Sequence, residues 1–228
     1  MEVSSAWERH ATDWITWART PGHDAFWSDT WPAVRALLPE PGERTLDLGS
    51  GEGRLSRELA ALGHRVVGLD RSPTLARAAR DAADLPVALA DAAAVPFADG
   101  AFDLVVACMV LHDVDDLAAT GAEIARVLRP GGRLVVAIVH PFITARDDEL
   151  SGTDEFRVGR PYLAPRRFAD RAERDGLAMT FESVHRPLSA YVAALGAHGL
   201  GITDLHEAGP RVVPWLLTFA ATRLPTGA

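Results

Sequence analysis

The chain contains no lysine and a single cysteine, and each of these features excludes a kind of chemistry. All 23 of its basic residues are arginines, so no lysine can form a Schiff base with a carbonyl substrate. Cys108 has no partner for an internal disulfide. No stretch approaches the roughly 18 apolar residues of a membrane span, and the first residues do not have the pattern of a secretory signal. We therefore expect a cytoplasmic protein with no membrane partner.

The balance of charge argues against nucleic acid as a partner. The formal net charge is −8 at pH 7, and the sequence has no arginine run that would form a basic patch. We therefore expect a small-molecule substrate. A length of 228 residues suits one domain with insertions, present as a monomer or a homodimer.

Between about residues 45 and 140, short β-branched runs alternate with segments of helical period. This alternation is typical of parallel βαβ units. Ser72 and Pro73 resemble the N-cap and first residue of one connecting helix, and residues 129–132 (Arg-Pro-Gly-Gly) predict a turn. The five predicted strands cover residues 45–48, 65–69, 87–89, 102–107 and 133–139.

The segments on either side of this core have other patterns. Residues 140–186 lack a clean period, so we expect an insertion on the substrate side with one extra strand at 179–184. A helix from Pro187 and strands at 202–205 and 215–222 would complete the sheet in a C-terminal part, residues 187–228. Residues 1–40 hold five of the six tryptophans and predict helices, which either pack on the sheet or form a lid. The core between them is residues 41–139.

The most informative segment is a strand that runs into a glycine-rich loop, Leu46-Asp47-Leu48-Gly49-Ser50-Gly51-Glu52-Gly53-Arg54. Glycines allow a ligand to approach the backbone at the start of the following helix. A dinucleotide fingerprint would require glycine at position 54, where this chain has Arg54. The carboxylates of Asp47 and Glu52 would repel a pyrophosphate and favour an ammonium or sulfonium group. S-adenosylmethionine carries both cations and no phosphate.

Two further acidic residues follow the second and third predicted strands. Asp70 can accept both hydroxyls of a ribose, or can share the capping of a helix with Ser72. Asp91 can accept from an adenine amino group beside the backbone N–H of Ala92, or can lie in a surface turn. After the fourth strand, Cys108 and Met109 are expected to line the same crevice, because ligands bind at the carboxyl ends of parallel strands.

Four motifs in this order resemble the class I S-adenosylmethionine-dependent methyltransferases, in the branch that modifies small molecules. They are LDLGSGEGR at 46–54, VVGLDRS at 66–72, ADAAAVPFADGAFDLVVACMVLHDVDD at 90–116 and VLRPGGRLVV at 127–136. The resemblance implies an α/β fold with a Rossmann-like, doubly wound, seven-stranded sheet whose last strand is antiparallel and inserted between the fifth and sixth. It also implies S-adenosylmethionine as cofactor and S-adenosylhomocysteine as product.

Residue by residue, the resemblance and the positions above give one predicted cofactor site. It comprises Asp47, Gly49, Ser50, Gly51, Gly53, Asp70, Arg71, Asp91, Ala92, Cys108, Met109, His112 and Trp17. No metal is expected, because the histidines come from separate segments without a short ligand spacing.

Methyl transfer needs alignment more than a catalytic group, but a hydroxyl or protonated amine acceptor needs a base. Histidine is the first candidate for this base. His112 is the preferred candidate, with His140 and His185 as alternatives, and Tyr162 can orient an acceptor or only pack. The run of Asp113, Asp115 and Asp116 is expected to cap the following helix.

Three functions fit these observations. The first is methyl transfer to oxygen, nitrogen or carbon of a small aromatic or apolar metabolite. The second is a cyclase or isomerase that retains its cofactor, and the third is a binding module without catalysis. The mass of the product separates the first two.

Overall fold

The computed structural model describes residues 5–83, 85–146, 156–209 and 213–225. The helices within these ranges are α1 (Ala6–Arg9), α2 (Ala11–Arg19), the π-helix η1 (Phe26–Thr30), α3 (Trp31–Leu37), α4 (Arg54–Ala61), α5 (Pro73–Ala83), α6 (Leu117–Val127), α7 (Pro141–Thr144) and α8 (Leu188–Gly196). The strands are β1 (Thr45–Leu48), β2 (Val66–Asp70), β3 (Val87–Leu89), β4 (Phe102–Cys108), β5 (Leu128–Val139), β6 (Arg166–Arg174), β7 (Leu177–His185), β8 (Leu200–Ala208) and β9 (Leu216–Arg223).

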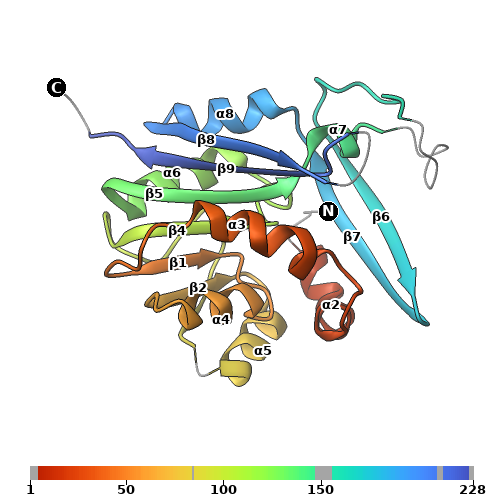
Figure 1. Cartoon of the computed structure of the whole chain (residues 1–228), viewed down its shortest axis with the longest axis horizontal. Coiled ribbons are helices and arrows are strands. Elements are labelled where there is room, and N and C mark those ends of the chain that lie inside the picture. The colour runs from red at the N-terminus through yellow and green to blue at the C-terminus, as the bar shows by residue number, and fades with distance from the viewer. Residues whose placement is uncertain (1–4, 84, 147–155, 210–212, 226–228) are drawn as a thin grey trace.

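The main sheet has seven strands in the order β3-β2-β1-β4-β5-β9-β8 (Figure 1). Strands β1 to β5 pair in parallel, whereas β9 is antiparallel to both of its neighbours, β5 and β8. The predicted fold class is therefore confirmed, including the antiparallel last strand between the fifth and sixth strands of the sheet.

Alternate residues of the central strands face opposite layers of helices, which is why the sequence alternates as it does. In β5, Leu134 and Val136 belong to the core formed with α6 and α8, whereas Val135 and Ala137 belong to the core formed with α3 and α4. All four side chains are fully buried. Helices thus cover both faces of the sheet, and its carboxyl edge is left to form a site.

Strand β5 begins earlier than predicted. It starts at Leu128 and includes residues 129–132, which the sequence analysis assigned to a turn. Gly131 has a φ of 75°, and the register with β4 shifts between Phe102 and Leu104. The turn residues therefore form an irregular start of the strand and do not precede it.

The substrate-side segment contains a β-hairpin that the sequence analysis recognised only in part. The predicted strand at 179–184 is the centre of β7, and its antiparallel partner β6 was missed. Most of β6 is exposed, so it carries no alternation of apolar and polar residues. The hairpin turns at Asp175 and Gly176, which both have positive φ, and an Asp-Gly pair is a known signal for such a turn.

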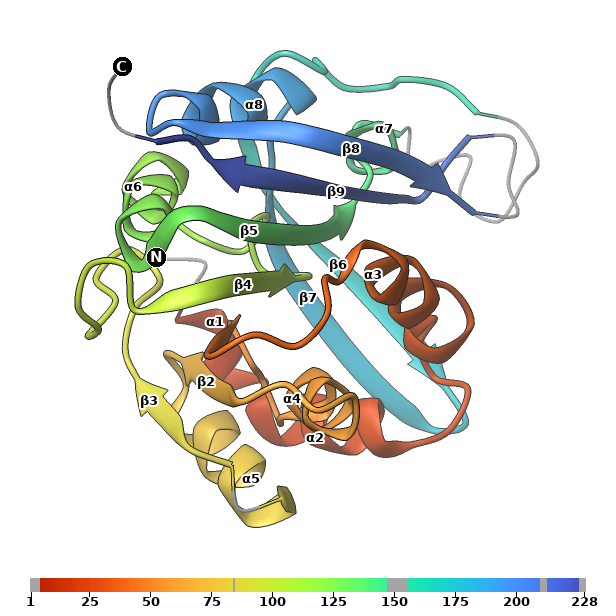
Figure 2. The ribbon, with the colours of Figure 1, turned by 60° about the vertical axis from the view of Figure 1, so that its left-hand side comes forward.

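The hairpin and the N-terminal helices lie together at the carboxyl edge of the sheet. Helix α2 packs against β7 on one side and α5 on the other. In Figure 2 the hairpin crosses the ends of the central strands, with α1 and α2 beside it. Among the described residues, no helix is both long and apolar enough to cross a bilayer.

Candidate active site

The glycine-rich loop connects β1 to α4 with a backbone that few other residues could adopt. Gly49, Gly51 and Gly53 have φ of 72°, 55° and 85°. A Cβ on Gly49 would lie 2.4 Å from Cγ2 of Val110, so this glycine also permits close packing on the segment after β4. The backbone N–H groups of Gly49 and Ser50 donate to the carbonyl of Leu69 at 2.8 and 2.9 Å, which fixes the loop beside β2.

A cavity of about 900 Å³ begins at this loop and extends over the carboxyl ends of the central strands. Eleven of the predicted site residues line it: Asp47, Gly49, Ser50, Gly51, Asp70, Arg71, Asp91, Ala92, Cys108, Met109 and His112. Gly53, Trp17, His140, His185 and Tyr162 do not line it. The far wall comes from the N-terminal helices and the β6–β7 hairpin, which the motifs do not cover.

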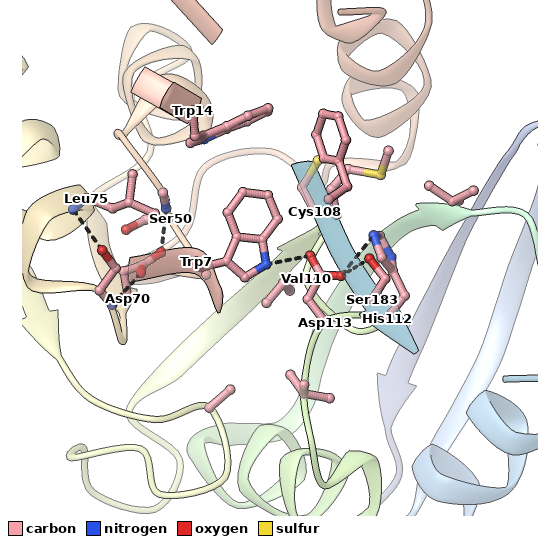
Figure 3. Close-up of a pocket in the computed structure, with 18 of the residues that line it drawn as sticks. Trp7, Trp14, Ser50, Asp70, Leu75, Cys108, Val110, His112, Asp113 and Ser183 are labelled. Atoms are coloured by element: carbon pink, nitrogen blue, oxygen red, sulfur yellow. Dashed lines mark hydrogen bonds and ion pairs between the residues drawn. The ribbon is translucent and has the colours of Figure 1, made fainter. Parts of the chain in front are cut away.

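Asp70 joins the end of β2 to the glycine loop. Its Oδ2 accepts from the Gly51 backbone N–H at 2.7 Å, and its Oδ1 accepts from the Ser72 N–H at 2.8 Å (Figure 3). Burial raises the pKa of Asp70, and these hydrogen bonds oppose that effect. Ser72 caps α5 itself by accepting from the Leu75 N–H at 3.1 Å. The carboxylate of Asp70 is thus held in the cavity wall, where its remaining lone pairs can accept hydroxyl groups.

Asp47 and Cys108 lie side by side beneath the loop, and neither is a free reactive group. Burial, with repulsion from Asp70, raises the pKa of Asp47 to about 7, although Ser56 donates to its Oδ2 at 2.5 Å. Burial and the Asp47 carboxylate raise the pKa of the Cys108 thiol to about 12. Cys108 therefore remains a neutral thiol and contributes packing.

Asp91 lies at the other end of this part of the cavity. One of its oxygens accepts from the Ala93 backbone N–H at 2.8 Å, and the other is 3.3 Å from Nη1 of Arg71. The side chains of Asp91 and Arg71 are about four-tenths exposed, so both can rearrange around a ligand.

The composition of this half of the cavity fits S-adenosylmethionine. Carboxylates of Asp47, Asp70 and Asp91 line it, as suits the hydroxyls and cations of that cofactor and not a pyrophosphate. The Ser50 hydroxyl is buried and has no hydrogen-bond partner among the described residues. This oxygen lies against Gly68 of β2, so it packs beneath the loop and does not itself face the cavity.

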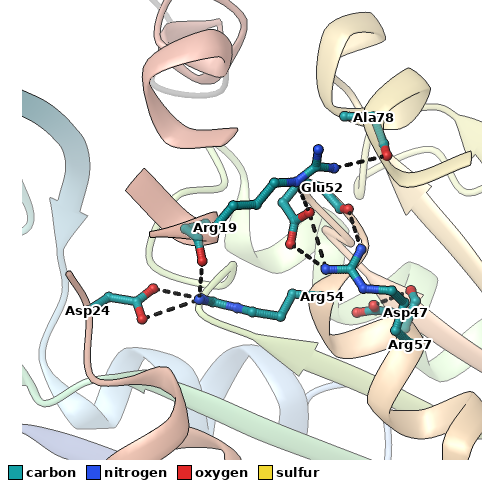
Figure 4. A network of polar contacts seen from close by, with 9 residues as sticks. Arg19, Asp24, Asp47, Glu52, Arg54, Arg57 and Ala78 are labelled. Carbon is teal, nitrogen blue, oxygen red and sulfur yellow. Dashed lines mark hydrogen bonds and ion pairs between the residues drawn. The ribbon is translucent and has the colours of Figure 1, made fainter. Parts of the chain in front are cut away.

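Glu52 and Arg54, at the end of the loop, form ion pairs with residues of the N-terminal segment. Glu52 is buried, and its charge is neutralised by Arg19 and Arg57, each at 2.9 Å (Figure 4). The sequence analysis expected this carboxylate to favour a cation of the ligand; Glu52 does line the cavity, but two arginines already neutralise its charge. Arg54 pairs with Asp24 at 2.7 Å, and its guanidinium lies 3.9 Å from the centre of the Phe26 ring.

Aromatic side chains from the N-terminal helices and β7 form another wall of the cavity, and Trp14 lies against Gly51 of the glycine loop. The Trp7 and Trp14 rings meet edge to face at 5.5 Å, and Phe181 of β7 lies 6.5 and 6.1 Å from them. All three line the cavity. Trp17, predicted as a cofactor residue, is buried behind Phe181 and packs against His23. The structure therefore puts Trp14, and not Trp17, at the cavity.

Three of the four catalytic candidates already make hydrogen bonds to other residues of the protein. Nε2 of His140 is 2.8 Å from Glu207, and its Nδ1 accepts from the Phe142 N–H at 3.1 Å, which caps α7. His185 contacts Thr144 at 2.6 Å and the Tyr162 carbonyl at 2.8 Å. The Tyr162 hydroxyl accepts from the Leu188 N–H at 3.2 Å. With both ring nitrogens in use and no place in the cavity wall, these histidines are structural groups in this arrangement.

His112 differs from the other two histidines because it lines the cavity beside Met109. Its Nε2 is 3.6 Å from Oδ1 of Asp113, and its Nδ1 is buried with no hydrogen-bond partner among the described residues. Met109 has a positive φ of 56°, which is rare outside glycine and directs the chain across the cavity.

Two of the acidic residues after His112 have different roles. Asp116 caps α6 by accepting from the Ala119 N–H at 2.9 Å, as predicted. Asp113 does not cap the helix, and that expectation was wrong. It is buried and accepts from Ser183 at 2.6 Å and from the Trp7 indole at 3.0 Å. Nothing in the sequence could indicate these contacts, because their partners are 70 and 106 positions away.

Comparisons with known proteins agree with this geometry. Residues 46–136 match the family described as a methyltransferase domain. A demethylmenaquinone methyltransferase of Beutenbergia cavernae is 44% identical over 117 residues, which cover 51% of this chain and 48% of that protein. The matched segment thus spans about half the length of the curated relative.

Solved structures extend the similarity beyond that segment. An S-adenosylmethionine-dependent methyltransferase from Mesorhizobium loti superimposes with a TM-score of 0.68 at 28% identity, covering 85% of this chain and 97% of its own. The 1,6-didemethyltoxoflavin-N1-methyltransferase of Burkholderia thailandensis, solved with S-adenosylhomocysteine, has a TM-score of 0.62 at 19% identity over 99% and 91% of the chains, which shows a common fold. Residues 46–136 are thus similar to the methyltransferase-domain family, and the chain as a whole has the fold of S-adenosylmethionine-dependent methyltransferases.

Within the described ranges, no group of three or more His, Cys, Asp or Glu side chains is arranged to hold a metal ion.

Proposed function

We propose that this protein transfers the methyl group of S-adenosylmethionine to a small, flat aromatic acceptor that carries an ionisable hydroxyl group. The observation that carries the proposal is the continuity of the cavity. One end is the glycine loop with its carboxylates, the other is an aromatic enclosure, and His112 lies in the wall they share.

The chain's own residues would hold the cofactor at the loop end. Asp70 would accept the ribose hydroxyls, Asp91 the adenine amino group, and the loop backbone from Gly49 to Gly51 would lie along the amino-acid part. The ionised form of Asp47 would face its positive charges. When bound, S-adenosylmethionine supplies an electrophilic methyl carbon whose bond to sulfur breaks with the electron pair left on sulfur.

The aromatic enclosure supports a flat acceptor. Trp7, Trp14 and Phe181 meet edge to face around the cavity, an arrangement that leaves slots for a further ring. Phe168 and Trp215 also line the cavity. A bound acceptor would displace water from this enclosure, which strengthens a nucleophile. The name of the Beutenbergia relative, a demethylmenaquinone methyltransferase, is consistent with an aromatic acceptor of this kind.

His112 is the proton acceptor in this proposal. As the acceptor oxygen bonds to the methyl carbon, its proton passes to a ring nitrogen of His112 and the acceptor gains no net charge. Nδ1 is the ring nitrogen without a partner among the described residues, and because it is buried in this structure, a turn of the ring would bring it to the acceptor.

The test has two stages. Calorimetric titration with S-adenosylmethionine and S-adenosylhomocysteine establishes whether the purified protein binds the cofactor. Incubation with S-adenosylmethionine and 1-naphthol, catechol or demethylmenaquinol, the last prepared by reducing demethylmenaquinone with dithionite, is then followed by mass spectrometry. We expect an acceptor heavier by one methylene unit and an equal amount of S-adenosylhomocysteine. An acceptor that rearranges without change of mass would contradict methyl transfer, and a purely aliphatic amine as the best acceptor would contradict the acceptor class.

A further inference from the structure

Three consecutive residues of α1 attach it to three different walls of the cavity. The Trp7 indole donates to Asp113 in the loop after β4 at 3.0 Å. Glu8 accepts from the hydroxyls of Ser72 and Thr74 at the start of α5, with 2.8 Å for Thr74. Arg9 donates to Glu182 of β7 at 2.7 Å. Helix α1 is therefore tied to the loop after β4, to the start of α5 and to β7, with Trp7 in the lining of the cavity.

The backbone of the loop that carries His112 is fixed from the side of β7. The Val184 N–H donates to the His112 carbonyl at 2.8 Å. The buried guanidinium of Arg186 donates to the carbonyl of Leu111 at 3.3 Å and to that of Val114 at 2.6 Å. These contacts fix the backbone position of His112. The rotation of its ring and its tautomer depend on the side chains around it.

Asp113 is the polar side chain next to that ring. Figure 3 shows it between Trp7 on one side and His112 with Ser183 on the other. Its Oδ1 accepts from Ser183 at 2.6 Å and faces Nε2 of His112 at 3.6 Å, while its Oδ2 accepts from Trp7. A separation of 3.6 Å is too long for a hydrogen bond but close enough for strong attraction between a carboxylate and an imidazolium in a buried site.

Resting on the proposed function, we propose that Asp113 is a positioning residue that orients His112 and stabilises its protonated ring. Trp7 and Ser183 hold the carboxylate in place. When helix α1 is packed against the cavity, Trp7 therefore holds Asp113 beside His112. If α1 moves away, Asp113 loses this hydrogen bond and no longer orients His112. Proton removal would then be efficient only in a closed, water-free cavity.

The other charges around the pair do not replace this role. From the β7–α8 connection, Arg186 faces Asp113 and favours its ionised form, which opposes the rise in the pKa of Asp113 that burial causes. From α8, Tyr191 is buried and its pKa is raised, so it stays neutral. From the loop itself, Asp115 pairs with Arg167 of β6 at 2.9 Å. Asp113 is therefore the anion nearest to the His112 ring.

The decisive measurement needs neither cofactor nor acceptor. The ¹⁵N chemical shifts of the His112 ring in labelled full-length protein report its tautomer, and His112→Gln identifies the signal. We expect wild-type protein to carry the proton on Nε2, facing Asp113, with Nδ1 bare. Asp113→Asn and Trp7→Phe should each give a mixture of tautomers. Trp7→Phe retains an aromatic ring and removes only the N–H donor.

Two control variants separate this effect from general changes. Asp116→Asn removes a charge three residues away and leaves a residue that still caps α6. Trp14→Phe removes an indole N–H that has no bond to Asp113. Both should retain the wild-type tautomer of His112. If Asp113→Asn and Trp7→Phe also retain it, the positioning role is overturned, whatever the protein's activity.

Kinetics supply the second readout, with the acceptor from the panel above that yields most S-adenosylhomocysteine. We expect Asp113→Asn to lower kcat by on the order of 100-fold with little change in KM, and the acid limb of kcat/KM to move to lower pH. Adding Asp113→Asn to His112→Gln should cause less than a threefold further loss, because the two act as a unit. Additive losses would contradict the proposal. A panel that yields no S-adenosylhomocysteine would count against the proposed function alone, because the tautomer measurement stands without it.

Discussion

The indole Nε1 of Trp7 donates to Oδ2 of Asp113 at 3.0 Å, across 106 positions of the chain. This contact joins the N-terminal helix to the residue that follows His112, the histidine of the predicted site that lines the cavity. The helix therefore does more than cover the sheet, since it also holds a residue beside the candidate base. The sequence analysis left open whether these helices pack or form a lid, and their contacts at the cavity favour the lid.

Asp70 is expected to contribute a large part of cofactor affinity. Asp70→Asn should weaken S-adenosylmethionine binding by on the order of 100-fold, because an amide cannot accept two hydroxyls as a carboxylate does. Calorimetric titration measures the change. Asp81→Asn, on the exposed side of α5, is the matched control and should bind like wild type. Equal affinity in the two variants would show that Asp70 does not face the ribose.

Asp47 should make cofactor binding depend on pH. Its pKa is raised to about 7 by burial, so below that pH the free protein holds it neutral, whereas a bound cation favours the carboxylate. Affinity should therefore rise by roughly tenfold between about pH 6 and 8 and level off above, with proton release on binding at the lower pH. Asp47→Asn should lose this component. Titrations in buffers of different ionisation enthalpy count the protons, and an unchanged pH slope in Asp47→Asn would contradict the assignment.

Arg54 should hold the N-terminal helices on the glycine loop. Arg54→Met removes its pair with Asp24, its bond to the Ala18 carbonyl and its contact with Phe26. We expect amide exchange in α2 to accelerate by on the order of tenfold or more, because these contacts oppose local opening. Hydrogen exchange with mass spectrometry measures it, and Arg35→Met, on the exposed face of α3, should leave exchange unchanged.

Gly49 should be required for two separable reasons. Gly49→Ala adds a Cβ at positive φ and places it 2.4 Å from Val110, whereas Gly131→Ala has a similar φ and nothing within 4 Å. Gly131→Ala should lose about 1 kcal/mol of unfolding free energy, and Gly49→Ala about 1–3 kcal/mol more, because overpacking adds to the backbone strain. Denaturant unfolding of both variants gives the difference. Equal losses of unfolding free energy in the two variants would show that the Val110 side chain moves away from the added Cβ without destabilising the protein.

The sequence predicted the central sheet well because its middle strands, β1, β4 and β5, are buried on both faces. Residues 45–48 and 87–89 coincide with β1 and β3, and the remaining predicted strands of the main sheet differ from the observed ones at their ends. The period of two along β5 reflects two layers of helices, which act on each residue locally. Strand β6 was missed because it is mostly exposed, so burial imposed no pattern on its sequence.

Some site residues could be found from the sequence, and the roles of others could be seen only in the structure. Glycines and acidic residues that follow buried strands were found, since the position of a parallel strand's end is predictable from its pattern. The three candidate histidines had similar positions in the sequence and differ only in their neighbours. Glu207 contacts His140 and Thr144 contacts His185. His112 instead lines the cavity, and its Nδ1 has no hydrogen-bond partner among the described residues.

The sequence by itself thus determined the sheet, the glycine loop and the acidic residues of the cofactor half, because each depends on local pattern and on strand order. Only the tertiary structure decided which histidine faces the cavity, that Asp113 lies beside it, and that α1 and β7 enclose them. Those outcomes depend on contacts between residues 41 to 106 positions apart in the chain, which are set by packing and leave no local signal in the sequence.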